Sequence, residues 1–173
     1  TPTCASVCPV GAFQKSSTVA VLYDAEKCIG CRYCMQACPF QVPRYEWGST
    51  SPRVQKCTMC NDRVSAGKKT ACAEACQFEA TIFGERGALI QEARRRIASD
   101  PTTYVNRIYG MEEAGRTSVL FISSVPFEKL GFPADLPHEP MPMLTWRVLS
   151  GVPKFAVTGS VALAGLWWIT KRR

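Results

Sequence analysis

Residues 28–39 read CIGCRYCMQACP, and this short stretch decides how the chain folds. Its pattern is C-x2-C-x2-C-x3-C-P, the spacing with which cysteine thiolates hold cubane iron–sulfur clusters. Cys28, Cys31 and Cys34 share one tight loop, so their sulfurs can reach three irons of one cube. Where two such runs interlock, the last cysteine of each ligates the other run's cluster, and Cys38 is therefore predicted to serve a second cube.

The remaining cysteines fall into two further groups, and all ten lie within the first 76 residues. The first group is C-x3-C-P, the back half of such a run. The third is C-x2-C-x11-C-x3-C, with an insertion between its second and third cysteines and Gln77 in place of the final proline. The predicted cofactor-binding and metal-ligating residues are Cys4, Cys8, Cys28, Cys31, Cys34, Cys38, Cys57, Cys60, Cys72 and Cys76.

Two other uses of cysteine compete with this interpretation. Ten cysteines could form five disulfides in an exported protein, or the CxxC pairs could hold structural zinc. Neither explains three cysteines at x2 spacing followed by C-P, because such close cysteines suit disulfides poorly and zinc sites pair two CxxC knuckles. The sequence therefore predicts [4Fe-4S] clusters, with a zinc-binding structural module as the alternative.

Composition and charge narrow the range of possible functions further. The chain has 173 residues and a formal charge of +7, but each cubane with four thiolates adds about −2, so the basic balance does not predict nucleic-acid binding. The cysteine-rich third is too short for a large apolar core, and the clusters are expected to hold it together. We find no phosphate-binding glycine loop and no acid–base pair, and the only histidine is His138. The sequence predicts no catalytic residue.

The pattern of residues predicts an α+β fold with short hairpins and helices. A hairpin is expected over 12–15 and 19–23, and a closing strand over 81–83. A helix is expected over 88–98, where apolar residues recur on one face, and a strand over 118–122. Five of the twelve prolines lie between 133 and 153, which predicts an extended connector.

The last part of the chain is apolar. Residues 155–170, FAVTGSVALAGLWWIT, carry no charge and are followed by Lys171, Arg172 and Arg173. We expect a transmembrane helix, the alternative being a buried or interfacial helix. The terminal cations would place the C-terminus in the cytoplasm and the cluster domain in the periplasm of a bacterial inner membrane. The expected domains are a cluster domain over 1–83, a connector with a helix and a strand over 84–151, and an anchor over 152–173.

Several motifs together resemble one family. They are TCASVCPVGA, KCIGCRYCMQACPFQVPRY, KCTMCNDRVSAGKKTAC, YVNRIYG and SVLFISSVPFEKLGFP, followed by the apolar end. In these the chain resembles the membrane-anchored, four-cluster ferredoxin-type subunits of respiratory oxidoreductases, most closely the HybA-type subunits of nickel-iron hydrogenases. The resemblance covers nearly the whole chain.

The resemblance implies a non-catalytic subunit with a ferredoxin-like polycluster fold. Such a subunit relays single electrons between a periplasmic hydrogenase-type catalytic subunit and a multi-pass, quinone-reactive membrane subunit. An equivalent subunit of a formate dehydrogenase or a molybdopterin reductase complex is the alternative. Two departures stand out: Gln77, Phe78 and Glu79 replace the family's proline-threonine-glycine, and Arg116 replaces a glycine.

The resemblance also implies how the ligands are shared. The chain opens at Thr1 within a motif, so we expect an upstream segment with the missing ligands and an export signal. Four clusters are expected in the full protein. The implied sets are Cys8, Cys28, Cys31 and Cys34 for one complete cluster, Cys4 and Cys38 for a second, Cys57, Cys60 and Cys72 for a third, and Cys76 for a fourth.

Overall fold

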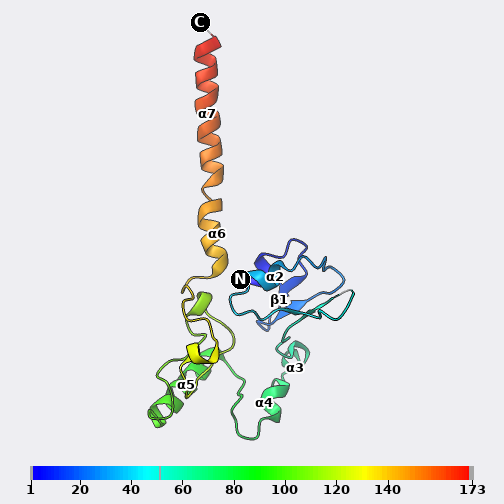
Figure 1. Cartoon of the computed structure of the whole chain (residues 1–173), viewed down its shortest axis with the longest axis vertical. Coiled ribbons are helices and arrows are strands. Elements are labelled where there is room, and N and C mark those ends of the chain that lie inside the picture. The colour runs from blue at the N-terminus through cyan, green and yellow to red at the C-terminus, as the bar shows by residue number, and fades with distance from the viewer. Residues whose placement is uncertain (1, 51, 172–173) are drawn as a thin grey trace. The chain divides into compact units, whose positions relative to one another are not determined.

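The computed structural model describes residues 2–50 and 52–171. The chain divides into two compact units, with the boundary between Pro140 and Met141. Figure 1 shows the order of the elements along the chain. In the cysteine-rich part these are α1 (Thr3–Ser6), β1 (Phe13–Lys15), β2 (Val21–Tyr23), α2 (Tyr33–Ala37), β3 (Arg44–Tyr45), β4 (Val54–Gln55), α3 (Asn61–Ser65) and α4 (Ala71–Ala75).

Two small antiparallel sheets frame the central cysteine loop. Strand β1 pairs with β2, with Phe13 opposite Tyr23, and β3 pairs with β4, with Tyr45 opposite Val54. The first hairpin confirms the prediction over 12–15 and 19–23. The second hairpin was not predicted, because strands of two residues are too short to show an alternating pattern.

The core of this part is small and contains a cysteine. Phe13, Cys34, Tyr45 and Val54 are buried and pack together, and Pro43 is fully buried. The predicted closing strand over 81–83 is wrong. Those residues form bends and irregular backbone with exposed side chains, so there is neither a neighbouring strand nor a buried face to hold them extended.

The following segment contains one regular helix and an aromatic cluster. Helix α5 (Arg86–Ser99) confirms the helix predicted over 88–98, and the Glu85 side chain caps its first turn. Beyond it lie two 3-10 turns, η1 (Glu113–Gly115) and η2 (Phe127–Leu130). Tyr109 and Phe127 are 2% exposed. The predicted strand over 118–122 is reduced to a single bridge between Tyr109 and Phe121, because ring packing rather than a ladder holds this region.

The second unit consists of α6 (Met141–Leu149) and α7 (Val152–Lys171), separated by a turn at Ser150 and Gly151. The prediction of an extended connector through 133–153 is wrong for α6. Pro142 and Pro153 each lie in the first turn of a helix, where a missing N–H costs nothing, so these prolines start helices rather than prevent them.

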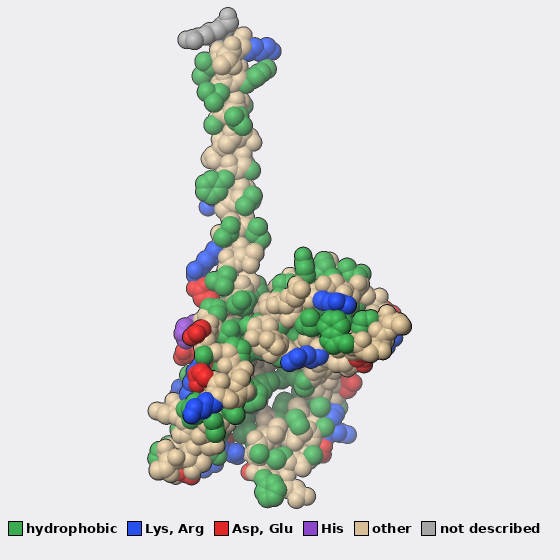
Figure 2. All heavy atoms as spheres, in the orientation of Figure 1, with side chains coloured by type: hydrophobic (Ala, Val, Ile, Leu, Met, Phe, Trp, Pro, Cys, Tyr) green, Lys and Arg blue, Asp and Glu red, His purple; other side chains and the backbone are tan. Residues whose placement is uncertain are grey.

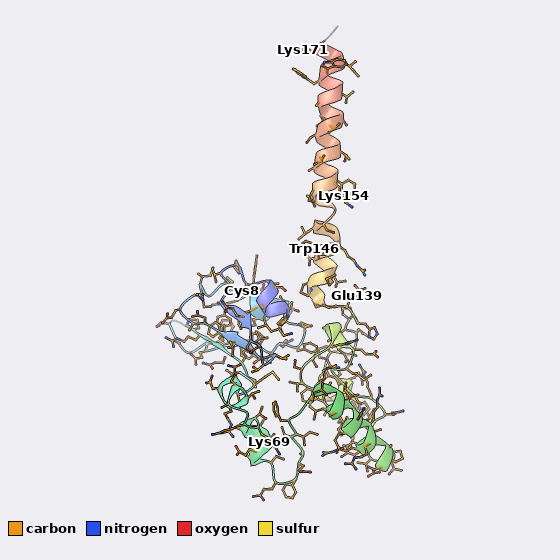
Figure 3. The ribbon with its side chains drawn as sticks, turned by 180° about the vertical axis from the view of Figure 1, so that it is seen from behind. Cys8, Lys69, Glu139, Trp146, Lys154 and Lys171 are labelled. Carbon is orange, nitrogen blue, oxygen red and sulfur yellow. The ribbon has the colours of Figure 1, made fainter. Side chains whose placement is uncertain are left out.

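The second unit is apolar over most of its length. Among the described residues it is the one helical stretch, Met141–Lys171, that is long and apolar enough to cross a membrane. Apolar side chains occur along its whole length in Figure 2, and Figure 3 shows Lys154 and Lys171 near the two ends of α7. The predicted cations Arg172 and Arg173 lie outside the described residues.

Candidate iron–sulfur site

A four-residue turn begins at the last cysteine of each group. We call these the cysteine turns, and they comprise residues 8–11, 38–41 and 76–79. In each, the amide of the fourth residue donates to the cysteine carbonyl. These bonds join Gly11 to Cys8 at 3.3 Å, Gln41 to Cys38 at 3.1 Å and Glu79 to Cys76 at 3.3 Å.

The fourth residue of every cysteine turn has a positive φ: 64° at Gly11, 51° at Gln41 and 50° at Glu79. Glycine adopts this conformation freely, whereas other residues pay a steric cost. The turn of residues 76–79, which contains Gln77, Phe78 and Glu79, therefore has the same geometry as the other two turns. In this turn the steric cost of the positive φ falls on Glu79.

Backbone amides also donate to the cysteine sulfurs, in a pattern that repeats between groups. In the first and third groups the last cysteine accepts from the residue four positions on: Ala12 to Cys8 and Ala80 to Cys76, both at 3.2 Å. Cys28 and Cys57, which open the second and third groups, accept from the residue two positions on. These bonds run from Gly30 to Cys28 at 3.4 Å and from Met59 to Cys57 at 3.3 Å.

These amides favour the thiolate, the form that binds iron. At Cys8 burial raises the pKa, but donation from the surrounding backbone N–H groups outweighs it, so the pKa of Cys8 is lowered. The N–H groups of Thr81 and Ala80 lower the pKa of Cys76. These N–H donors stabilise the thiolate even in the absence of a metal, and a cluster ligand requires such stabilisation.

Electrostatic interactions show which other cysteines are neighbours. Burial raises the pKa of Cys4, and the nearby Cys38 raises it further. Burial also raises the pKa of Cys34, where a hydrogen bond from Tyr45 lowers it and the charges of Cys28 and Cys31 raise it.

The structure brings some of the predicted ligands together. Cys4, Cys8 and Cys28 pack around the core that contains Cys34, and Figure 3 marks Cys8 there and Lys69 between α3 and α4. The cysteines of the third group, Cys57, Cys60, Cys72 and Cys76, lie in and beside α3 and α4, outside that core. All ten cysteines are free thiols, which does not support the disulfide alternative.

The sulfurs do not meet at one point: within residues 2–50 and 52–171, no group of three or more potential ligands converges on a single metal ion. A cubane is bonded through separate iron atoms, so its thiolates need not converge in that way. The donor set of thiolates with N–H···S bonds thus fits [4Fe-4S] ligation.

Two other side chains beside these cysteines were missed. Burial and the charges of Cys34 and Cys28 raise the pKa of Tyr45 to about 12. The Lys56 ammonium donates to the carbonyls of Val21 and Cys57, and burial lowers the pKa of Lys56. No spacing of residues in the sequence identifies Tyr45 or Lys56 as neighbours of the cysteines. Their position depends on the two hairpins.

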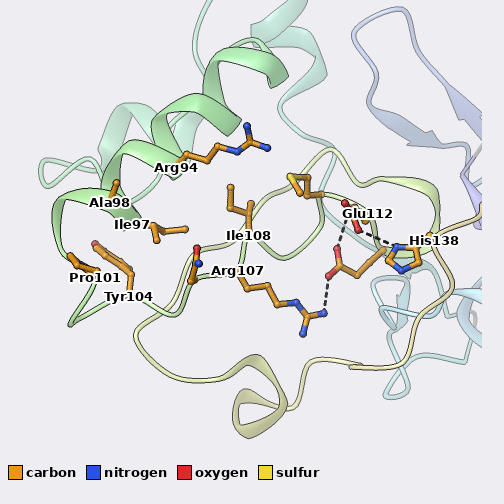
Figure 4. A pocket seen from close by; sticks show the side chains of 12 residues that line it. Arg94, Ile97, Ala98, Pro101, Tyr104, Arg107, Ile108, Glu112 and His138 are labelled. Atoms are coloured by element: carbon orange, nitrogen blue, oxygen red, sulfur yellow. Dashed lines mark hydrogen bonds and ion pairs between the residues drawn. The ribbon is translucent and has the colours of Figure 1, made fainter.

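A separate cavity of about 810 Å³ lies beside α5 (Figure 4). At its edge His138 Nδ1 lies 3.3 Å from Glu112 Oε2. The cavity contains no cysteine and is therefore distinct from the cysteine site. It is lined by Arg94, Ile97, Ala98, Pro101, Tyr104, Asn106, Arg107, Ile108, Met111, Glu112, Glu113 and His138.

Residues 1–86 match the 4Fe-4S dicluster domain family. Residues 1–86 therefore form an iron–sulfur domain of this ferredoxin-type family, and its cofactors are [4Fe-4S] clusters.

Three relatives place the chain more closely. A protein of Nitratidesulfovibrio vulgaris is 41% identical over 173 residues, 99% of this chain and 47% of the relative. Hydrogenase-2 operon protein HybA of Escherichia coli O157:H7 is 36% identical over 158 residues, 76% of this chain and 48% of the relative. The iron-sulfur subunit of the nitrate-inducible formate dehydrogenase of Escherichia coli K12 is 33% identical over 172 residues, which are 95% of this chain and 57% of the relative. The chain spans about half the length of these relatives.

Proposed function

We propose that this protein is a non-catalytic electron-transfer subunit of an oxidoreductase complex. The observation that carries the proposal is the repeated set of N–H···S bonds at Cys8, Cys28, Cys57 and Cys76 within a 4Fe-4S dicluster domain. When bound, such a cluster accepts and donates one electron at a time. The residues of this chain hold the thiolates in place and set the local electrostatic potential.

We assign one complete ligand set to Cys8, Cys28, Cys31 and Cys34. The packing of Cys8 and Cys28 against Cys34 supports this assignment. Cys4 and Cys38 belong to a second cluster, and the effect of Cys38 on the Cys4 thiol supports their proximity. Cys57, Cys60 and Cys72 serve a third cluster and Cys76 serves a fourth.

The direct test is a count of iron, zinc and acid-labile sulfide per chain in anaerobically purified protein. About four irons and four sulfides for each complete cluster, with an EPR signal on reduction, are expected. Replacing Cys31 by serine should remove one cluster selectively. Zinc without sulfide would instead indicate the structural zinc module and overturn the proposal.

We propose further that residues 152–173 anchor the protein in a bacterial inner membrane, with the cluster domain in the periplasm and the C-terminus in the cytoplasm. Residues 1–83 are the cluster domain, and 84–151 connect it to the anchor. The length and apolar surface of α7 support the anchor. A C-terminal reporter that is active only outside the cytoplasm should be silent, and activity would contradict this orientation.

The proposed partners are a hydrogenase-type catalytic subunit and a quinone-reactive membrane subunit. Similarity to HybA supports the first, and similarity to a formate dehydrogenase iron-sulfur subunit supports the alternative complex. Purification from membranes in mild detergent should recover the chain with one catalytic subunit. Identification of that subunit by mass spectrometry distinguishes a hydrogenase from a formate dehydrogenase or molybdopterin reductase.

A further inference from the structure

The Lys56 side chain links the first hairpin to the third cysteine group. Its ammonium donates to the carbonyl of Val21 on β2 and, across 3.0 Å, to the carbonyl of Cys57. Val21 and Cys4 both pack against the buried core that contains Cys34. The ammonium is thus anchored on one side to the core that carries Cys4 and on the other side to Cys57 itself.

A second link, which carries no charge, joins the same two segments. The Thr18 hydroxyl, in the turn of the first hairpin, donates to the Asn61 side-chain oxygen at the start of α3 across 2.6 Å. The Ser16 and Thr18 hydroxyl oxygens lie 2.7 Å apart, which holds Thr18 in place. The position of the Lys56 ammonium therefore does not depend on its own hydrogen bonds alone.

No carboxylate neutralises the charge of Lys56. Both of its acceptors are backbone carbonyls, and across residues 2–50 and 52–171 no aspartate or glutamate forms a salt bridge with it. The side chain is partly buried. Burial lowers the pKa of Lys56, and the thiolates of Cys4 and Cys57 oppose that effect. The lysine thus supplies a localised positive charge beside predicted ligands of two different clusters.

We infer that the Lys56 ammonium is a fixed positive charge that raises the reduction potentials of two clusters, the one held by Cys57 and the one held by Cys4. The inference rests on the ligand sets proposed above. Reduction adds one electron to a cluster, and therefore one negative charge, while no proton or bond is exchanged. A fixed cation stabilises that charge, and it acts more strongly where burial lowers the effective dielectric constant. Removal of this one charge should therefore move two midpoint potentials in the same direction.

Two variants serve as controls. Lys27 directly precedes Cys28, the first cysteine of its group, just as Lys56 precedes the first cysteine of the third group. The Lys27 ammonium lies 3.0 Å from the Asp24 carboxylate and its side chain is 52% exposed, so solvent screens its charge and Lys27→Met should shift the potentials much less. Thr18→Val removes the uncharged link between the two segments and should leave every potential unchanged.

The experiment is a potentiometric titration, followed by EPR, of the full-length protein purified anaerobically with its clusters. In Lys56→Met two midpoint potentials should fall. For each, the reduced-to-oxidised ratio at a fixed potential should drop about tenfold, which corresponds to ~59 mV for a one-electron couple. Lys56→Arg keeps the charge and should restore both potentials to near the wild-type values. Iron and sulfide content should be the same in all variants.

The outcomes separate this inference from the proposed function. Unchanged midpoints in Lys56→Met at normal iron and sulfide content would overturn the role of Lys56 and leave the clusters established. A shift in one midpoint alone would overturn its action on two clusters, and an equal shift in Thr18→Val would show that structure rather than charge is responsible. A wild-type protein without iron and sulfide would overturn the proposed function and the inference together. If Lys56→Met fails to fold, Lys56→Gln, which keeps an N–H donor without the charge, decides the question by the same criteria.

Discussion

The Arg96 guanidinium donates to the backbone carbonyl of Glu79 across 2.9 Å, and this contact ties helix α5 to the cysteine turn of residues 76–79. The arginine is held on its other side by Glu92, at 2.7 Å. Its side chain is 25% exposed, so the guanidinium is partly removed from water. A helix that lies almost wholly beyond the 4Fe-4S domain thus supports the segment that presents Cys76.

Replacing Arg96 by methionine should destabilise the protein by about 1–2 kcal/mol, because the Glu79 carbonyl loses a charged donor and Glu92 loses a partner. Arg95→Met is the control. Arg95 binds the same Glu92 at 2.7 Å but is 69% exposed, and its loss should cost much less because solvent screens this pair. Urea unfolding of both variants measures the difference. Equal losses would show that the contact with Glu79 is unimportant.

Glu79→Gly should stabilise the protein by about 1 kcal/mol, because glycine removes the steric cost of a φ of 50°. The reciprocal change is Gly11→Ala, in the equivalent turn. A Cβ added at Gly11 would meet no atom within 4 Å, so the expected cost of about 1 kcal/mol is conformational alone. Differential scanning calorimetry checks both. A stabilising Gly11→Ala would refute the shared turn geometry.

Gly110→Ala should destabilise the protein by about 3 kcal/mol. Gly110 has a φ of 93°, and an added Cβ would collide with the Thr117 side chain and the Val119 carbonyl. Gly131→Ala is the matched control: its φ is 77° but the space around it is open, and it should cost only about 1 kcal/mol. Thermal unfolding of the two variants separates collision from backbone strain, and similar losses would contradict the prediction.

Glu113 should make stability depend on acid pH. Burial raises the pKa of Glu113, but backbone N–H donors, including that of Gly110 at 2.7 Å, and the Arg107 guanidinium hold it below its ordinary value. Its stabilising contribution is therefore complete above the ordinary carboxyl pKa of about 4.3 and is lost as pH falls through the lowered pKa.

Unfolding free energies measured between pH 3 and 6 test this dependence. Glu113→Gln should cost about 2 kcal/mol at pH 6, with a difference from wild type that shrinks in acid. Glu128→Gln is the control, since Glu128 binds the same Arg107 at 3.0 Å but is 50% exposed. A constant difference across this pH range would contradict the role of Glu113.

Leu163→Arg should weaken membrane association. Leu163 lies near the middle of α7 and is 68% exposed, and an arginine at the centre of a spanning helix costs about 2.5–3.5 kcal/mol. Thr145→Arg on α6 should have little effect. The measurement is the fraction of protein that remains with membranes after carbonate extraction. Full retention of Leu163→Arg would indicate that α7 does not span the bilayer.

The sequence predicted the features that depend on local spacing. The cysteine groups, the first hairpin, α5 and the apolar end are visible because each follows a repeating pattern of a few residues. The strands expected over 81–83 and 118–122 failed because β-structure needs a partner, and residues such as Ile82 and Phe83 have none in the described structure.

The site was only partly predictable for the same reason. Spacing identified the thiolates, but Tyr45 and Val54 pack against Cys34 only after two hairpins bring distant residues together. Helix α6 was not predicted, because its prolines were interpreted as helix breakers. Pro142 lies in the first turn, where a helix accepts a proline. Contacts between segments, rather than local propensity, account for these differences.

The amide donors of Cys8, Cys28, Cys57 and Cys76 all come from within four residues of the sulfur that they contact. Each of these four ligands thus has part of its electrostatic environment fixed by its own short peptide. Exchange of a single turn between related proteins would transfer that setting with it. Evolution could in this way retune one redox centre without altering the others, a modularity suited to a chain of centres that must stay graded along its length.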